Sequence, residues 1–198
     1  MDLQISVFLL FILFTAGHSL KCYECNDPMG SCADQKVQTC PSGSSQCMST
    51  TSVTQVGISS KVSAKSCAVA CQNVSINFDI LKMTSSCCDT DLCNAKDNSD
   101  PSTNVPNGKK CFSCDGNSCL NIMSCSGTED RCIEATEASG GQSVVLKGCA
   151  SKSICDSASL FGVNGISCCE GNLCNGDQSV SQSFLFLCCS LLSYFLLH

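Results

Sequence analysis

Large apolar side chains are sparse between residues 20 and 175, and their spacing there is not that of an amphipathic helix. Residues 48–56 and 61–69 are instead rich in Val, Thr and Ser, and they flank a glycine-containing stretch at residues 57–60. Because β-branched residues favour strands and glycine permits a tight reversal, this pattern predicts a β-hairpin.

The same pattern returns later in the chain. Residues 131–139 and 143–149 flank Gly140, Gly141 and Gln142, and the paired glycines make this the stronger turn signal. A further cysteine-bounded loop follows each hairpin, at residues 71–87 and 155–168. The fold class predicted from these patterns is all-β.

Two longer apolar runs lie near the ends of the chain. The first, residues 5–14, is followed by small residues, as is typical of a secretory signal peptide. Residues 1–19 are therefore predicted to be removed, which makes Leu20 the first mature residue. Cleavage after Gly17 is the alternative.

The second run, residues 184–197, has fourteen residues without a charge, whereas a membrane-spanning helix needs about 20 apolar residues. Small residues and then a polar spacer precede it, which is typical of a GPI-attachment signal. Asn175 is the predicted attachment residue, and residues 176–198 are predicted to be removed. The alternative attachment residues are Gly176, Asp177 and Ser179. A retained short anchor or an ordinary apolar C-terminus is the other interpretation of this run.

Cysteine content gives the strongest indication of architecture, since 22 of the 198 residues are cysteine. Cys188 and Cys189 belong to the predicted C-terminal signal, and the other 20 form two blocks of ten. The first block is Cys22, Cys25, Cys32, Cys40, Cys47, Cys67, Cys71, Cys87, Cys88 and Cys93. The second is Cys111, Cys114, Cys119, Cys125, Cys132, Cys149, Cys155, Cys168, Cys169 and Cys174. Such density and repetition predict two copies of a disulfide-rich domain from an oxidising compartment.

A polar segment, residues 95–110, separates the two blocks. It contains two prolines, and Val105 is its single apolar side chain after Ala95, so it is predicted to be a solvated linker. Each block has roughly 65–75 residues, a size at which a hydrophobic core alone is marginal. Five disulfides per block, at about 2–4 kcal/mol each, are the predicted main source of stability.

Both blocks open on Cys-x-x-Cys and close on Cys-Cys, four residues and Cys-Asn. Together with ten cysteines per block, these motifs resemble the LU domain of the lymphocyte-antigen and urokinase-receptor family of three-finger proteins. The resemblance implies two tandem three-finger domains, residues 20–94 and 111–175, joined by a flexible linker at residues 95–110. The urokinase receptor has three such domains, and its first lacks one bridge, so urokinase binding is not expected here. The two-domain members that the chain resembles are GPI-anchored surface glycoproteins or secreted phospholipase inhibitors.

The resemblance also implies how the cysteines pair. In the first domain the implied bridges are Cys22–Cys47, Cys25–Cys32, Cys40–Cys67, Cys71–Cys87 and Cys88–Cys93. In the second they are Cys111–Cys132, Cys114–Cys119, Cys125–Cys149, Cys155–Cys168 and Cys169–Cys174. In this family the closing asparagine ties the end of the domain to the knot by hydrogen bonds, a role implied for Asn94 and Asn175.

The sequence disfavours catalysis. The only histidines, His18 and His198, lie in segments predicted to be removed, which leaves no histidine for a catalytic base or a metal site. The two Cys-x-x-Cys openings match redox and zinc motifs, but paired cystines are favoured in a secreted chain. Asp89 and Asp91 are predicted to be solvated charges. No enzyme activity, cofactor or metal is predicted, and a net charge of −6 without a basic patch argues against nucleic acid.

Ligand contacts are expected at the finger tips, because a knot fixes the fingers while their tips vary. Phe161, in an apolar stretch at residues 160–163, is a possible contact, as is Phe78; the alternative is that each packs against its own domain. Tyr23 and Phe112 hold equivalent places in the two openings and are predicted to be packing residues. The tips of the two predicted hairpins carry no charge, which disfavours the channel modulation of family members with a cation there.

Asn73 begins the only Asn-x-Ser/Thr sequon and is predicted to be glycosylated; an unused sequon is the alternative. Together these features predict a non-enzymatic, GPI-anchored recognition or adhesion protein on the extracellular face of the plasma membrane. Its expected partners are protein ligands on the cell surface or in the matrix. A soluble secreted inhibitor of a phospholipase or protease is the alternative, which the apolar tail disfavours.

Overall fold

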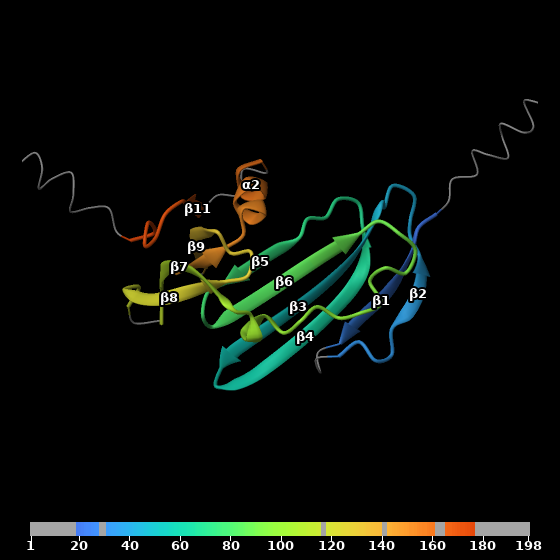
Figure 1. Ribbon diagram of the computed structural model, residues 1–198, viewed down its shortest axis with the longest axis horizontal. Coiled ribbons are helices and arrows are strands. Elements are labelled where there is room, and N and C mark those ends of the chain that lie inside the picture. The colour runs from blue at the N-terminus through green and yellow to red at the C-terminus, as the bar shows by residue number, and fades with distance from the viewer. Residues whose placement is uncertain (1–18, 28–30, 116–117, 140–141, 161–164, 177–198) are drawn as a thin grey trace, which may run out of the picture. The chain divides into compact units, whose positions relative to one another are not determined.

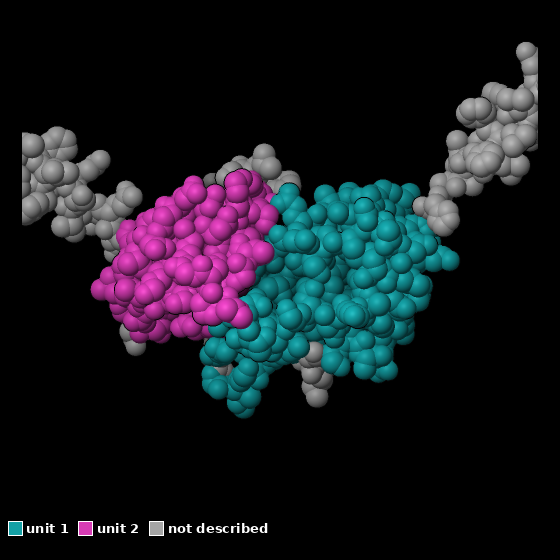
Figure 2. All heavy atoms as spheres, viewed as in Figure 1, with its two compact units in different colours: residues 1–75, 81–104 teal, residues 76–80, 105–198 magenta. Residues whose placement is uncertain are grey.

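The computed structural model describes residues 19–27, 31–115, 118–139, 142–160 and 165–176 (Figure 1). The chain divides into two compact units, coloured separately in Figure 2. Unit 1 comprises residues 1–75 and 81–104, and unit 2 comprises residues 76–80 and 105–198. The predicted signal peptide at residues 1–19 and the predicted C-terminal signal at residues 176–198 lie outside the described residues, except for Ser19 and Gly176.

Unit 1 is built on antiparallel strands. They are β1 (Lys21–Asp27), β2 (Lys36–Thr39), β3 (Gln46–Val56), β4 (Ile58–Ala68) and β6 (Leu81–Cys88). Strand β3 lies between β4 and β6, and β1 joins β4 to β2. Strand β5 (Val74–Asn77) begins in unit 1 and ends in unit 2.

The predicted first hairpin is confirmed, although its turn is tighter than expected. Strands β3 and β4 pair continuously from Gln46 opposite Ala68 to Val56 opposite Ile58. Gly57 alone makes the reversal, at φ 71°, in a region of backbone space that favours glycine. The result is a long central finger whose base carries the knot cysteines Cys47 and Cys67 opposite each other.

Part of the segment predicted to be a solvated linker is held on unit 1 by polar contacts, although most of its residues stay exposed. Residues 95–103, which we call the strap, follow the closing Asn94 and include a single 3₁₀ turn, η1 (Pro101–Thr103), whose Pro101 is buried. The Asn98 side chain donates hydrogen bonds to the Ser49 carbonyl at 2.7 Å and the Thr84 carbonyl at 3.3 Å. The strap therefore covers β3 and β6 through polar contacts, which composition alone did not indicate.

Unit 2 contains the strands β7 (Pro106–Ser113), β8 (Asn121–Ser126), β9 (Arg131–Ser139), β10 (Gln142–Ala150) and β11 (Ile166–Cys169), and the helix α2 (Lys152–Leu160). Strands β7 and β8 form a separate two-stranded sheet. Strand β9 pairs with β10 and β11, which confirms the second predicted hairpin.

Helix α2 departs from the expectation that no segment is helical. It has nine residues, too few for its apolar positions to show a convincing helical period. Its first amide, that of Lys152, donates a 2.7 Å hydrogen bond to the Asp130 carboxylate, and Lys152 pairs with Asp156 one turn later. A carboxylate distant in the chain thus supplies the N-terminal hydrogen bond that a helix start needs.

One core of unit 2 includes the short segment at residues 76–80. Phe78, Ile133, Ala150 and Cys155 form a buried cluster, with Ile133 and Ala150 fully inaccessible. Strand β10 accommodates the segment at Gly148, where an added Cβ would overlap the carbonyl oxygen of Asn77. Phe78, one of the two aromatic residues weighed as a ligand contact, is therefore a core residue of unit 2.

Candidate functional site

Each unit is organised around a disulfide knot. In unit 1 the bridges are Cys22–Cys47, Cys25–Cys32, Cys40–Cys67, Cys71–Cys87 and Cys88–Cys93. In unit 2 they are Cys111–Cys132, Cys114–Cys119, Cys125–Cys149, Cys155–Cys168 and Cys169–Cys174. The structure thus contains the same ten pairs that the family resemblance implies.

Asn94 closes the knot of unit 1 with three hydrogen bonds. Its Oδ1 accepts from the Tyr23 amide at 2.9 Å, and its Nδ2 donates to the Tyr23 carbonyl at 2.9 Å and the Met48 carbonyl at 3.1 Å. The side chain is buried, so these three backbone groups would be hard to satisfy without it.

Asn175 occupies the same place in unit 2. Its Oδ1 accepts from the Phe112 amide at 2.9 Å, and its Nδ2 donates to the carbonyls of Phe112 at 3.0 Å and Ile133 at 3.1 Å. Phe112 and Tyr23 are half-buried, and each is held through its backbone by the closing asparagine. The duplicated sequence motif therefore has a duplicated hydrogen-bond pattern.

The sulfur-rich centres of the knots do not offer metal ligands. Among the described residues, two sets of cysteines bring their sulfur atoms within 4.8 Å of one another: Cys22, Cys40 and Cys67, and Cys111, Cys125 and Cys149. All six are in disulfides, and a metal ligand would have to be a thiolate. These centres are structural cross-links.

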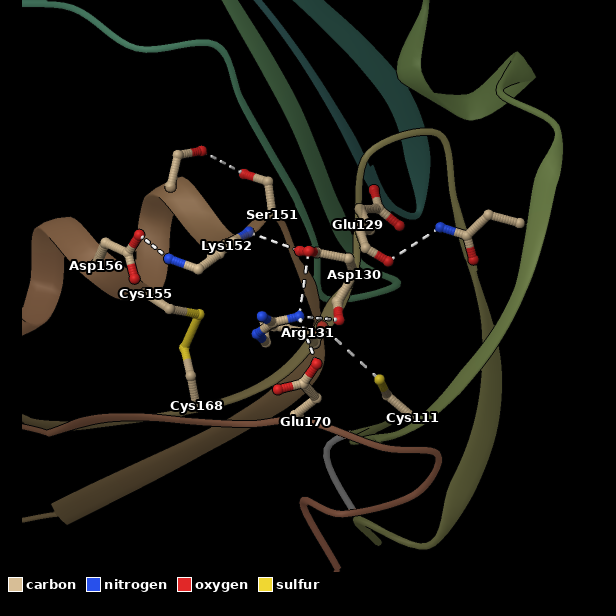
Figure 3. Close-up of polar contacts among 12 residues, drawn as sticks. Cys111, Glu129, Asp130, Arg131, Ser151, Lys152, Cys155, Asp156, Cys168 and Glu170 are labelled. Carbon is tan, nitrogen blue, oxygen red and sulfur yellow. Dashed lines mark hydrogen bonds and ion pairs between the residues drawn. A yellow bond between two sulfur atoms is a disulfide. The ribbon is translucent and has the colours of Figure 1, made fainter.

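A charged network surrounds the start of α2 (Figure 3). Arg131 Nη1 lies 3.1 Å from Asp130 Oδ2 and 3.6 Å from Glu170 Oε1. Asp130 also accepts the hydrogen bond from the Lys152 amide, and the Lys152 ammonium pairs with Asp156. Each charge in this network has an opposite partner, so it joins β9, α2 and the closing loop at Glu170 to one another.

A surface depression of about 500 Å³ lies in unit 1 beside β1 and β4. Its lining residues are Glu24, Cys25, Asn26, Asp34, Lys36, Ala64, Lys65 and Ser66. The lining charges are of both signs, and Lys65 is paired with Asp97. This arrangement favours no particular ligand.

The described residues at the tips of the two central fingers are apolar or neutral. Ile58, next to the turn of the central finger in unit 1, is 89% exposed, and Val144 on the corresponding finger of unit 2 is 51% exposed. Phe161 and the tip residues Gly140 and Gly141 lie outside the described residues. Ile58 was not singled out from the sequence, because a lone isoleucine among serines resembles an ordinary turn neighbour.

Asn73 is exposed, and its Oδ1 accepts a 2.9 Å hydrogen bond from the Cys87 amide. The acids Asp89 and Asp91 are also exposed, and Asp91 accepts a 2.9 Å hydrogen bond from the Lys21 amide. Asp91 therefore links the closing motif of unit 1 to its first strand.

In the part of the chain that the structure describes, no helix has the length and hydrophobicity needed to cross a membrane.

In comparisons with known proteins, each half of the chain matches a family model. Residues 18–96 match the family model of the u-PAR/Ly-6 domain, and residues 110–175 match that of snake toxins and toxin-like proteins. Prostate stem cell antigen of Homo sapiens is 34% identical over 79 residues, which cover 40% of this chain and 68% of that protein. The chain belongs to the u-PAR/Ly-6 family. Its two units are three-finger domains of the kind that defines that family.

A further u-PAR/Ly-6 relative matches nearly the whole chain. The urokinase plasminogen activator surface receptor of Rattus norvegicus is 28% identical over 90% of this chain, but the alignment covers only 62% of the receptor. The Bos taurus receptor is 36% identical, over 45% of this chain and 31% of its own length. The crystal structure of mouse TEX101 aligns with a TM-score of 0.32 and 22% identity, over 65% of this chain and 83% of that chain.

Proposed function

We propose that this u-PAR/Ly-6 protein is a non-enzymatic, GPI-anchored recognition protein on the extracellular face of the plasma membrane, which binds protein ligands through its fingers. The observation that carries the proposal is the duplicated knot, in which five cystines and one closing asparagine hold the base of each unit together. A rigid base with exposed finger residues such as Ile58 and Val144 suits binding rather than catalysis.

The relatives support a place at the cell surface, since one is named a surface receptor and another an antigen. The apolar tail at residues 184–197 supports a lipid anchor. With attachment at Asn175, the anchor would be on its main-chain carboxyl, while its side chain would keep the hydrogen bonds to Phe112 and Ile133. Attachment at Gly176, Asp177 or Ser179 would preserve the same contacts.

The test is release from intact cells. The full chain is expressed in animal cells with a tag after Leu20, and the cells are treated with a phosphatidylinositol-specific phospholipase C. We expect tagged protein on the surface before treatment and in the medium after it. A matched variant that ends after Ser183, and so lacks the apolar tail, should appear in the medium without the enzyme.

Two outcomes would contradict the proposal. Full-length tag in the medium without the enzyme would favour the alternative, a soluble secreted inhibitor of a phospholipase or protease. Surface protein that the enzyme cannot release would indicate a retained C-terminal tail. Neither outcome would alter the assignment of the two domains.

A further inference from the structure

The two-stranded sheet of unit 2 has one buried and one outward face. Phe112 on β7 lies opposite Ile122 on β8, and Lys110 lies opposite Ser124. Directly paired residues point to the same side of a sheet, as do alternate residues along a strand, so Lys110, Phe112 and Ile122 share one side. Leu120 immediately precedes β8. Leu120 is 69% exposed and Ile122 is 59% exposed. We call Phe112, Leu120 and Ile122 the apolar face.

Residues on the buried side of the sheet fix the orientation of the apolar face. Cys111, Met123 and Cys125 alternate with the outward residues and form a buried cluster with Cys132 and Cys149. Two of these cysteines are bridged to β9 and β10, which holds the sheet in place. The sheet cannot turn its apolar side inward without breaking the knot, so Leu120 and Ile122 remain in solvent unless something covers them.

The C-terminal end of unit 2 lies against this same face. A Cβ built on Gly176 would come within 2.8 Å of Phe112 Cε2, so the ring of Phe112 lies directly over Gly176. The Leu173 amide donates a 2.8 Å hydrogen bond to the Lys110 carbonyl, and Asn175 bonds both backbone groups of Phe112. These contacts place the end of the described chain, orange-red in Figure 1, beside β7. The chain therefore leaves unit 2 at the edge of the apolar face.

We infer that the apolar face rests on the outer leaflet of the membrane that carries the anchor. The inference rests on the proposed GPI attachment. Even attachment at Ser179 would leave three residues after Gly176, a span of at most about 11 Å. Only these residues and the glycan of the anchor would separate Phe112 from the lipid, so the anchor would raise the effective concentration of the leaflet at that face.

The chemistry of the face suits the headgroup region of a bilayer. Aromatic and aliphatic side chains partition into the boundary between headgroups and acyl chains. Lys110, on the same side and exposed, would lie at the level of the lipid phosphates, where a lysine can extend its ammonium to water. Three apolar side chains would bind lipid only weakly on their own, so the contact would depend on the anchor.

The absence of tryptophan from the sequence allows a direct test. The full-length anchored protein is purified in two forms, Ile122→Trp and the matched control Val144→Trp, which also replaces an exposed apolar strand residue of unit 2. Each is reconstituted through its anchor into phosphatidylcholine vesicles that contain lipids brominated on the acyl chain. We expect bromine to quench Ile122→Trp fluorescence at least about twofold more than that of Val144→Trp.

Each outcome decides the inference. Equal quenching of the two variants would overturn it while leaving the anchor intact, as release by the phospholipase would show. A blue shift of Ile122→Trp that grows with protein density in bromine-free vesicles, without extra quenching by brominated ones, would also overturn it and indicate contact with a second copy. Protein that never acquires an anchor overturns the proposed function and this inference together.

Discussion

The ammonium of Lys65 lies 2.8 Å from the Asp97 carboxylate, and the Lys65 side chain is only 1% exposed. The same Nζ donates to Gln35 Oε1 at 2.6 Å and to the Ala95 carbonyl at 2.7 Å. An ammonium has three protons, and here each has an acceptor. Two of the three acceptors belong to the strap, so a buried lysine of β4 holds the strap on unit 1.

Removal of the strap carboxylate should destabilise unit 1. Asp97→Asn leaves the Lys65 ammonium buried without a counter-ion, and breaking a buried ion pair costs about 3 kcal/mol or more. We expect a loss of about 3 kcal/mol in the free energy of unfolding, measured by guanidinium denaturation with the disulfides intact. Asp89→Asn, at an exposed acid of the same unit, is the control and should change stability little. Equal losses in the two variants would mean that the pair contributes nothing specific.

The Lys65–Asp97 ion pair also predicts that the stability of unit 1 decreases at acid pH. Burial raises the pKa of Asp97, but hydrogen bonds from Lys65 and the Cys32 amide, and the charges of Lys65 and Lys61, outweigh it and hold the pKa below 3.8. The unfolded chain therefore takes up the proton first as pH falls. The stability that Asp97 confers should be complete above its unfolded pKa, near 3.8, and be lost as pH falls through the lower folded value.

The measurement is the unfolding midpoint between about pH 2 and 6, a range that brackets the carboxylate titration. Asp97→Asn should lower the unfolding midpoint at the high-pH end of this range, and the midpoint of the variant should decrease less than that of the wild type as the pH falls. Asp100→Asn should do the same, because hydrogen bonds from Ser102 lower the pKa of Asp100 despite partial burial. Parallel curves for the wild type and Asp97→Asn would contradict the assignment.

The closing asparagine should be needed as an amide, not merely as a polar side chain. Asn94→Asp keeps the shape and can still accept from the Tyr23 amide, but it cannot donate to the carbonyls of Tyr23 and Met48. We expect Asn94→Asp and Asn94→Ala each to cost about 2–3 kcal/mol in thermal unfolding. Asn94 is preferred to Asn175 for this test, because a change at Asn175 would also alter the proposed GPI-attachment residue. An aspartate variant as stable as the wild type would show that the donated bonds are dispensable.

Gly148 should be intolerant of any side chain. A methyl group there overlaps the Asn77 carbonyl oxygen, so residues 76–78 would have to leave β10 and draw Phe78 from its cluster with Ile133. We expect Gly148→Ala to destabilise unit 2 by about 3 kcal/mol, a cost similar to that of overpacking a core. Hydrogen exchange should quicken at the Cys149 and Ala150 positions of β10. Val144→Ala, a truncation of an exposed residue on the same strand, should leave exchange unchanged.

Glycosylation at Asn73 is testable by gel mobility. Asn73→Gln should migrate faster than the wild type from animal cells, and treatment with an N-glycosidase should abolish the difference between them. Asn107→Gln, at an asparagine outside any sequon, is the control and should migrate like the wild type. A wild-type band that the glycosidase does not shift would indicate an unused sequon.

The sequence predicted the hairpins well because their strands and turns are coded locally. The bounds predicted for the first strand of the second hairpin, residues 131–139, are those of β9. In the first hairpin the expected four-residue turn is a single glycine, because Ile58 pairs with Val56 despite its exposed, turn-like neighbours. The cysteine pairing was implied by the family resemblance alone, since spacing permits many pairings.

The missed features depend on partners that are distant in the chain. Helix α2 begins where the Asp130 carboxylate accepts the Lys152 amide, and these residues are 22 positions apart. The strap looked solvated because it is polar, but the face that it covers is polar too, with Ser49 and Lys65 both buried there. A polar segment can pack when its donors and acceptors are matched one by one, and composition does not reveal such matching.

Each unit begins and ends at the same place, since Tyr23 is bonded to Asn94 and Phe112 to Asn175. Tension between the two ends of a unit's chain would therefore act between neighbouring points. The load would fall on a few hydrogen bonds and then on the cystines at the base, and the fingers of that unit would lie outside its direct path. If the fingers of unit 1 hold a ligand and the proposed anchor holds Asn175, unit 2 would transmit the tension while its own fingers keep their shape.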